Sequence, residues 1–192
     1  QIKDVEDAYW NLGSRGGKHY QVSLSRNYFG IMYRADLFKE KGIKIPFNSV
    51  DDLITAAKKL TEPDKTMGIQ RFGLGQAFSK DKADPPLATA FILAKQGSIF
   101  DQSGKAIWNS NAGIEAYKTM IDMIRVHKIT PESAISKTAE DLYQEFIAGQ
   151  YAMITAAGVR IPSVRSQIKV TKPEDVEFMI VPGIEGTQYS PP

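Results

Sequence analysis

A few side chains in this sequence have types that could support chemistry, and their spacing limits what that chemistry is. His19 and His127 are far apart, and neither has a metal-ligating residue three or four positions away. Gly73 and Gly75 form a G-x-G without the later glycine and acid of a dinucleotide fingerprint. The sequence therefore predicts neither a metal site nor a bound cofactor.

Carboxylates are numerous but are not arranged as a catalytic pair. Most fall in the expected first turns of helices, where a negative charge complements the helix dipole. An enzyme acting on carbohydrate is one alternative, and it would need two cleft carboxylates about 5–9 Å apart. An interaction module is a second alternative, and it would need a large exposed apolar patch. We expect a binding protein and no enzyme.

Polar and aromatic residues follow three expected strands, and these are the candidate ligand contacts. The carboxyl ends of strands and the helix N-termini after them present free N–H groups to a polar guest. We expect the three corners, around Asn27, Gln76 and Gly158, to converge on one wall of an open groove. The candidates are Arg26, Asn27 and Tyr28 at the first corner, Gln76 and Phe78 at the second, and Gly158, Val159 and Arg160 at the third.

The bulk composition excludes several classes of protein. The chain has 192 residues, a net charge of +2 and no basic run, which argues against nucleic acid as a partner. It contains no cysteine, so disulfides and thiolate metal sites are excluded. No apolar stretch approaches the ~20 residues that span a bilayer. The polar start shows no signal peptide. If the protein is exported, we expect that its leader has been removed or that this sequence begins downstream of it.

The segment 143–160 is the one around which the other elements are expected to be arranged. Phe146 lies three positions after Tyr143, which gives a helix with one apolar face, and Thr138 is a suitable N-cap. Gly149 is expected to end this helix in the left-handed conformation. The apolar run 151–155 then predicts a buried strand, and Gly158 lies at the turn into another helix.

Similar patterns predict the rest of the chain as alternating strands and helices. Helix starts and stops are marked by caps, prolines, glycines and charges that match the dipole. We expect helices at 1–12, 35–42, 50–60, 87–96, 112–126 and 159–168, strands at 19–24, 28–34, 69–75 and 176–181, and a hairpin at 99–108.

Four stretches contain motif residues at fixed spacings. They are Phe146, Gly149, Ala152, Met153 and Gly158; Gly17, Lys18, Tyr20, Val22, Tyr33, Asp36, Leu37, Phe38, Lys39, Glu40 and Gly42; Ser49, Asp51, Asp52, Leu53, Ala56, Ala57, Lys58, Lys59 and Leu60; and Gly97, Phe100, Asp101, Gly104, Lys105 and Asn109. With these residues the chain resembles family 1 extracellular solute-binding proteins, the carbohydrate receptors of ABC importers, and the likeness covers nearly all of residues 17–183. The chain departs from the family pattern at Ser23, where proline is common, and at Arg34-Ala35, which replace Asn-Lys.

This resemblance implies an α/β fold, the lobe of a type II periplasmic binding protein, with a small, mainly parallel sheet and helices on both faces. Family members are longer and have two lobes joined by crossing strands. It implies that 25–180 is the second lobe, that 1–24 is the edge of the first lobe with a crossing strand, and that 181–192 is the return crossing. The first lobe is then missing from this chain.

The resemblance further implies capture of a sugar or oligosaccharide between two lobes, without a cofactor, for delivery to the membrane permease subunits of an ABC transporter. The location implied is the periplasm, or the outer face of the cytoplasmic membrane through a lipid anchor. Sugars are bound by flat apolar faces and by planar polar side chains that pair with hydroxyls.

Arg160 departs from the family, whose members often have a sugar-stacking tryptophan there. An arginine near a helix N-terminus predicts a ligand with a carboxylate or phosphate, or a guanidinium stacked on a sugar. A sugar acid or a phosphorylated polyol is therefore the alternative ligand class.

Overall fold

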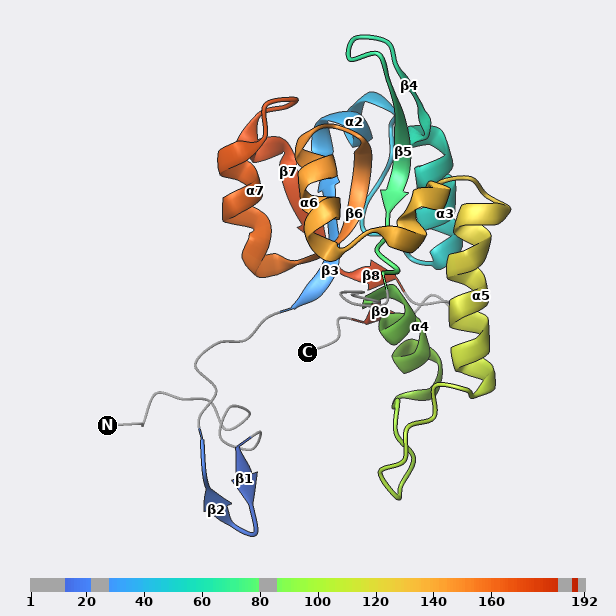
Figure 1. The fold of residues 1–192 in the computed structure, drawn as a ribbon, viewed down its shortest axis with the longest axis vertical. Coiled ribbons are helices and arrows are strands. Elements are labelled where there is room, and N and C mark those ends of the chain that lie inside the picture. Colours follow the sequence, from blue (N-terminus) through green and yellow to red (C-terminus); the bar gives the residue numbers. More distant parts are fainter. Residues whose placement is uncertain (1–12, 22–27, 80–85, 183–187, 190–192) are drawn as a thin grey trace.

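A five-stranded mixed sheet forms the centre of the molecule (Figure 1). The computed structural model describes residues 13–21, 28–79, 86–182 and 188–189. The strand order is β4-β5-β6-β3-β7, so neighbours in the sheet are distant in sequence. The strands are β3 (Phe29–Arg34), β4 (Glu62–Asp64), β5 (Ile69–Gly75), β6 (Tyr151–Ala157) and β7 (Val176–Met179).

The register fixes the direction of each strand. β5 runs parallel to β6, with Leu74 opposite Met153, whereas β3 is antiparallel to both of its neighbours, β6 and β7. β4 is antiparallel to β5. The expected α/β class is confirmed, but the sheet is mixed and not mainly parallel, because β3 enters between β6 and β7 in the opposite direction.

Helices cover both faces of this sheet, as expected. One apolar cluster joins the sheet to four helices, α2 (Ala35–Glu40), α3 (Val50–Leu60), α4 (Pro86–Gln96) and α5 (Asn111–Arg125). A second cluster joins the other face to α6 (Ala139–Ile147) and α7 (Ile161–Gln167). Side chains alternate along β3, so Ile31 and Tyr33 enter the first cluster and Met32 the second.

Local signals set the helix starts. The Ser49 hydroxyl accepts the N–H of Asp52 at the start of α3, and Ser110 does the same for Gly113 at the start of α5. Thr138 begins α6 with a reciprocal capping box, described below. These caps explain why the predicted helix positions agree closely with the observed ones.

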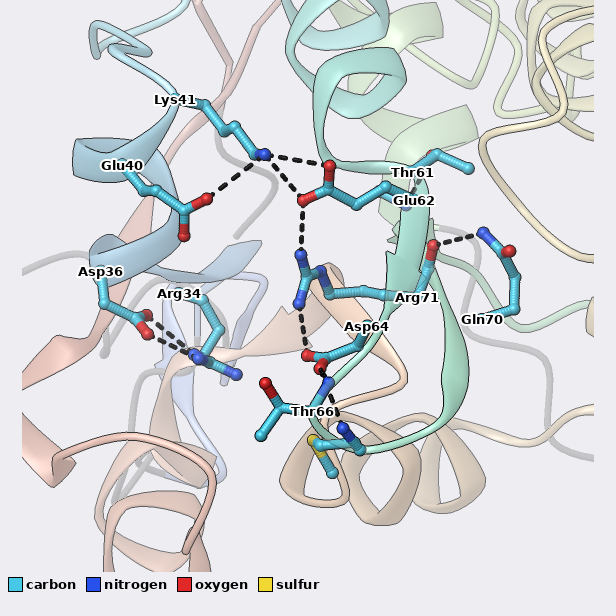
Figure 2. Close-up of polar contacts among 12 residues, drawn as sticks. Arg34, Asp36, Glu40, Lys41, Thr61, Glu62, Asp64, Thr66, Gln70 and Arg71 are labelled. Atoms are coloured by element: carbon cyan, nitrogen blue, oxygen red, sulfur yellow. Dashed lines mark hydrogen bonds and ion pairs between the residues drawn. The ribbon is translucent and has the colours of Figure 1, made fainter.

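Ion pairs fasten the sheet near β4 and the end of β3 (Figure 2). The Arg71 guanidinium on β5 is buried and donates to Glu62 and Asp64 on β4, each at 2.8 Å. Arg34, also buried, donates from Nε to Asp36 at 2.8 Å. These buried cations are therefore each held by a carboxylate, which is what their burial requires.

The remaining short elements refine the sequence-based expectations. A hairpin of β1 (Ser14–Arg15) and β2 (Lys18–His19) forms where a loop and a strand start were predicted, and β4 lies in a predicted loop. The 99–108 hairpin is reduced to one bridge, Phe100 to Ala106. After β7 the chain forms β8 (Val181–Pro182), which pairs with β9 (Gln188–Tyr189). The predicted helix 1–12 and most of the strand 19–24 lie outside the described residues.

Three 3-10 turns connect the larger elements: η1 (Glu132–Ser136), η2 (Gly158–Arg160) and η3 (Pro173–Asp175). Within the described ranges, no helix combines the length and apolar character needed to cross a bilayer.

Candidate functional site

Three strand ends meet at one edge of the sheet. Phe29, the first residue of β3, lies opposite Ala157, the last residue of β6. Gly75, the last residue of β5, lies beside Ile154 of β6. The segments that follow β5 and β6, and the residue that precedes β3, therefore emerge at the same edge, the lower one in Figure 1.

The corner between β3 and β6 is closely packed around Gly158. The Gly158 N–H donates to the Tyr28 carbonyl at 2.8 Å. A Cβ built on Gly158 would lie 2.2 Å from Cε2 of Tyr28, so the ring occupies the space of a side chain. The ring also meets Phe178 edge-on, with centroids 5.2 Å apart. Tyr28 as a whole remains 46% exposed, so part of this residue is accessible at the edge.

The opposite side of the same corner is held by α6. Ala157 donates its N–H to the Tyr143 hydroxyl at 2.9 Å, and the Tyr143 side chain is buried. The Arg160 guanidinium lies over the Tyr143 ring, 4.5 Å from its centroid. It also donates to Glu140 at 2.6 Å. Arg160 is therefore part of a contact cluster within the lobe.

The corner after β5 has an inward-facing amide. Gln76 is 1% exposed, and its Nε2 donates to the Thr130 hydroxyl at 3.0 Å. That hydroxyl donates in turn to the Leu74 carbonyl at 2.8 Å. The Thr130 proton is thereby used, so the Gln76 amide nitrogen must face Thr130. Gln76 Oε1 is buried without a hydrogen-bond partner among the described residues.

Phe78, two residues after Gln76, is partly buried against the first apolar cluster. Its backbone N–H donates to the Ala134 carbonyl at 3.0 Å, which ties the segment after β5 to η1. This position agrees with either a ligand contact or a cover for the core, the two roles that the sequence allows.

The predicted contact residues therefore divide into three groups. Tyr28, Gly158 and Val159 lie together, and Val159 is 58% exposed. Gln76 and Phe78 lie at the neighbouring strand end, with the Gln76 amide directed into the protein. Arg160 is paired with Glu140. Arg26 and Asn27 lie outside the described residues.

Three residues of this edge were not among the sequence candidates: Glu140, Tyr143 and Phe178. Tyr143 and Phe178 were interpreted only as apolar positions of a helix and a strand. Their contacts join segments far apart in the chain, as in the 20-residue separation of Arg160 and Glu140. No spacing rule along the sequence identifies such pairs.

The edge shows no arrangement suited to metal chemistry. Within the described parts of the chain, no three His, Asp or Glu residues come close enough together to bind a metal ion. A hollow of about 210 Å³ lies between the α2–α3 connection and α3, and none of its lining residues is a predicted contact. The half-exposed Tyr28 makes the edge suited to non-covalent binding.

A known protein family matches nearly the whole chain. A sequence profile described as bacterial extracellular solute-binding protein matches residues 1–190. No curated protein sequence matches the chain.

Solved structures share this fold at low sequence identity. Maltose-bound MalE3 of T. maritima has a TM-score of 0.83 at 21% identity, over 99% of this chain and 47% of its own. The GacH receptor of Streptomyces glaucescens GLA.O, solved unliganded and with acarbose, has a TM-score of 0.77 at 22% identity, over 98% and 46%. An ABC transporter solute-binding protein from Agrobacterium vitis S4 with bound D-mannitol gives 0.73 at 22%, over 95% and 43%. The chain thus spans about half the length of these proteins.

Proposed function

The chain belongs to the family of bacterial extracellular solute-binding proteins, and we propose that it is one lobe of a receptor that captures a sugar or polyol for an ABC importer. The structural relatives hold maltose, acarbose and D-mannitol, which supports a ligand rich in hydroxyl groups. The proposed role is binding, in which no bond is made or broken.

The observation that carries this proposal is the convergence of β3, β5 and β6 at one edge, with Tyr28 half-exposed there. An aromatic ring packs against the C–H surface of a sugar, and polar groups around it bind the sugar hydroxyls. We propose that Tyr28, Gly158 and Val159 form the centre of the lobe's binding wall. Gln76 and Phe78 would flank it, and Arg26 and Asn27 adjoin it in sequence.

The chain covers 47% of the length of MalE3 from T. maritima. We propose that 25–180 is the second lobe, that 1–24 belongs to the edge of the first lobe and its crossing strand, and that 181–192 is the return crossing. Ligand contacts to both lobes would stabilise the closed state. The partners would be the first lobe and the membrane permease subunits, in the periplasm or at the outer face of the cytoplasmic membrane.

As the ligand class we propose a neutral sugar or polyol, and not a sugar acid or a phosphorylated polyol. The acidic alternative was based on Arg160, and the pairing of this guanidinium with Glu140 at 2.6 Å accounts for its charge within the lobe. A carbohydrate-active enzyme is not preferred either, because the family and the structural relatives are binding proteins.

NMR titration of the ¹⁵N-labelled chain tests the proposal, because it detects weak binding and locates it. We expect maltose or D-mannitol, at up to roughly 50 mM, to bind with a millimolar dissociation constant, which corresponds to about −4 kcal/mol. Amide shifts should be confined to the residues around Tyr28 and Gly158. Tyr28→Ala should abolish them, whereas Tyr117→Ala, which removes an exposed ring on α5, should not.

Three outcomes would count against the proposal. Micromolar affinity of the isolated chain would contradict the need for a second lobe. Shifts confined to the hollow beside α3 would contradict the proposed edge. The absence of shifts with either ligand at these concentrations would contradict the ligand class.

A further inference from the structure

Arg160 belongs to a set of contacts that joins α6 to the end of β6. Its guanidinium donates to Glu140 and lies over the ring of Tyr143, and both partners are on α6, three residues apart. Tyr143 in turn accepts the N–H of Ala157, the last residue of β6. We propose that Arg160 is a positioning residue that braces this corner through Tyr143, and that it does not contact an anionic group of the ligand.

The Ala157 N–H needs a hydrogen-bond partner from outside the sheet, because β5 ends before it reaches this part of β6. The pairing of β5 with β6 extends only to Gly75 opposite Ile154, so β6 continues three residues beyond it. The next N–H, of Gly158, points to the other side and donates to Tyr28. The Tyr143 hydroxyl thus replaces a missing strand, and the orientation of η2 depends on where the Tyr143 ring is held.

Two interactions hold the Arg160 guanidinium against α6. A guanidinium attracts the face of an aromatic ring, and an ion pair limits its rotation. Arg160 has both interactions at once, and the Arg160 and Glu140 side chains are 36% and 57% exposed. Glu140 also places a negative charge beside the guanidinium, so an anionic ligand group there would meet repulsion as well as attraction. The statement about ligands rests on the proposed receptor function, whereas the bracing role of Arg160 does not.

Amide hydrogen exchange of the 192-residue chain tests the brace without any ligand. We expect Arg160→Ala to raise the exchange rate of the Ala157 amide by about threefold to thirtyfold, the combined size of an exposed cation–π contact and a surface ion pair. Arg160→Lys should restore part of the protection. Arg125→Ala, which removes an exposed arginine on α5, is the control and should leave the rate unchanged.

Two further variants test the individual contacts of Arg160 and Tyr143. Tyr143→Phe keeps the ring under Arg160 but removes the acceptor, so the Ala157 amide should exchange at least as fast as in Arg160→Ala. Glu140→Gln should give a smaller increase, because the ring contact persists. An Ala157 exchange rate in Arg160→Ala within a factor of about two of the wild-type rate would overturn the brace.

Matched neutral and anionic probes test the second half of the proposal. D-mannitol and mannitol 1-phosphate, or glucose and glucuronate, are titrated into wild-type and Arg160→Ala protein by NMR. We expect Arg160→Ala to weaken both members of a pair by the same factor. A selective loss of the anionic probe would show that Arg160 contacts the anion and would overturn the inference. If no probe bound the wild-type protein, the receptor proposal would fail while the exchange result still decided the brace.

Discussion

The ring of Tyr28 occupies the space that a side chain at Gly158 would need. A Cβ added to Gly158 would lie 2.2 Å from Cε2 of Tyr28 and 2.3 Å from its Cζ. Gly158 does not have a positive φ, so the requirement is for space and not for an unusual backbone conformation. Glycine at this position therefore leaves room for the ring just after the end of β6.

Gly158→Ala should displace the Tyr28 ring and destabilise the chain. Forcing a methyl group into a filled contact costs about 1–3 kcal/mol, and part of this cost is avoided if the ring moves outward. Urea denaturation should report a lower midpoint with an unchanged slope.

The double variant Tyr28→Ala/Gly158→Ala provides the control. Without the ring the added methyl has room, so the cost of Gly158→Ala should largely disappear in the Tyr28→Ala background. Equal costs in the two backgrounds would mean that Gly158 is needed for a reason other than this contact.

The ion pair of Arg34 and Asp36 should make the stability depend on acid pH. Burial alone would raise the pKa of Asp36, but the hydrogen bond and charge of Arg34, with smaller help from Thr171, lower it below the usual 3.8. A lowered pKa in the folded state means that the stabilisation is present above about pH 4 and is lost as the pH falls through the folded pKa.

Asp36→Asn should therefore flatten the fall in unfolding free energy between about pH 5 and pH 2. At pH 7 it should cost about 1–3 kcal/mol, because the buried Arg34 loses its carboxylate. Urea denaturation at a series of pH values gives both quantities. Glu174→Gln removes an exposed carboxylate, and a pH profile of Asp36→Asn as steep as that of this control would refute the assignment.

The capping box at the start of α6 gives a third prediction. The Thr138 hydroxyl accepts the N–H of Asp141, and the Asp141 carboxylate accepts the N–H of Thr138 at 2.8 Å. Thr138→Ala should lower the free energy of unfolding by about 1 kcal/mol, whereas Thr138→Ser keeps the hydroxyl and should lower it far less. Urea denaturation distinguishes the two variants, and equal stability of both would show that the cap contributes nothing.

The helices α3, α5 and α6 were predictable because each carries its own N-cap and apolar face. α3 and β5 have the predicted boundaries, Val50–Leu60 and Ile69–Gly75. β6 is longer than predicted because Ala156 and Ala157 have little strand preference of their own, and pairing with β3 extends the strand to include them. The direction of β3 is likewise set by pairing across the sheet, which no local pattern records.

At the candidate site the strand ends and the direction of Gln76 were predictable, but the pairing of Arg160 was not. The register places the ends of β3, β5 and β6 at one edge, which brings Tyr28, Gly158 and Gln76 to the same end of the sheet, whereas Asn27 lies outside the described residues. Gln76 lies two positions after the buried Leu74, so an extended chain directs both side chains to the same side. This signal for the inward direction of Gln76 was present in the sequence. The pairing of Arg160 with Glu140 depends on how α6 packs, and no such signal exists for it.

Arg165 covers the exposed edge of the sheet, and this gives the fourth prediction. β7 is an edge strand, and its Val176 carbonyl accepts two hydrogen bonds from Arg165, from Nε at 3.0 Å and from a terminal nitrogen at 2.7 Å. An open edge carbonyl is a site where another strand can add. Arg165→Ala should lower the free energy of unfolding by about 1–3 kcal/mol, the size of a lost hydrogen bond to a charged group.

The same variant should self-associate more readily, because the freed carbonyl can pair with a strand of a second molecule. Sedimentation velocity over a range of concentrations measures this, and Arg165→Lys should fall between wild type and Arg165→Ala because it retains the charge but loses the two-pronged geometry. Arg125→Ala is the charge-matched control. If Arg165→Ala sediments as wild type does and is also equally stable, then α7 itself, and not the arginine, protects this edge.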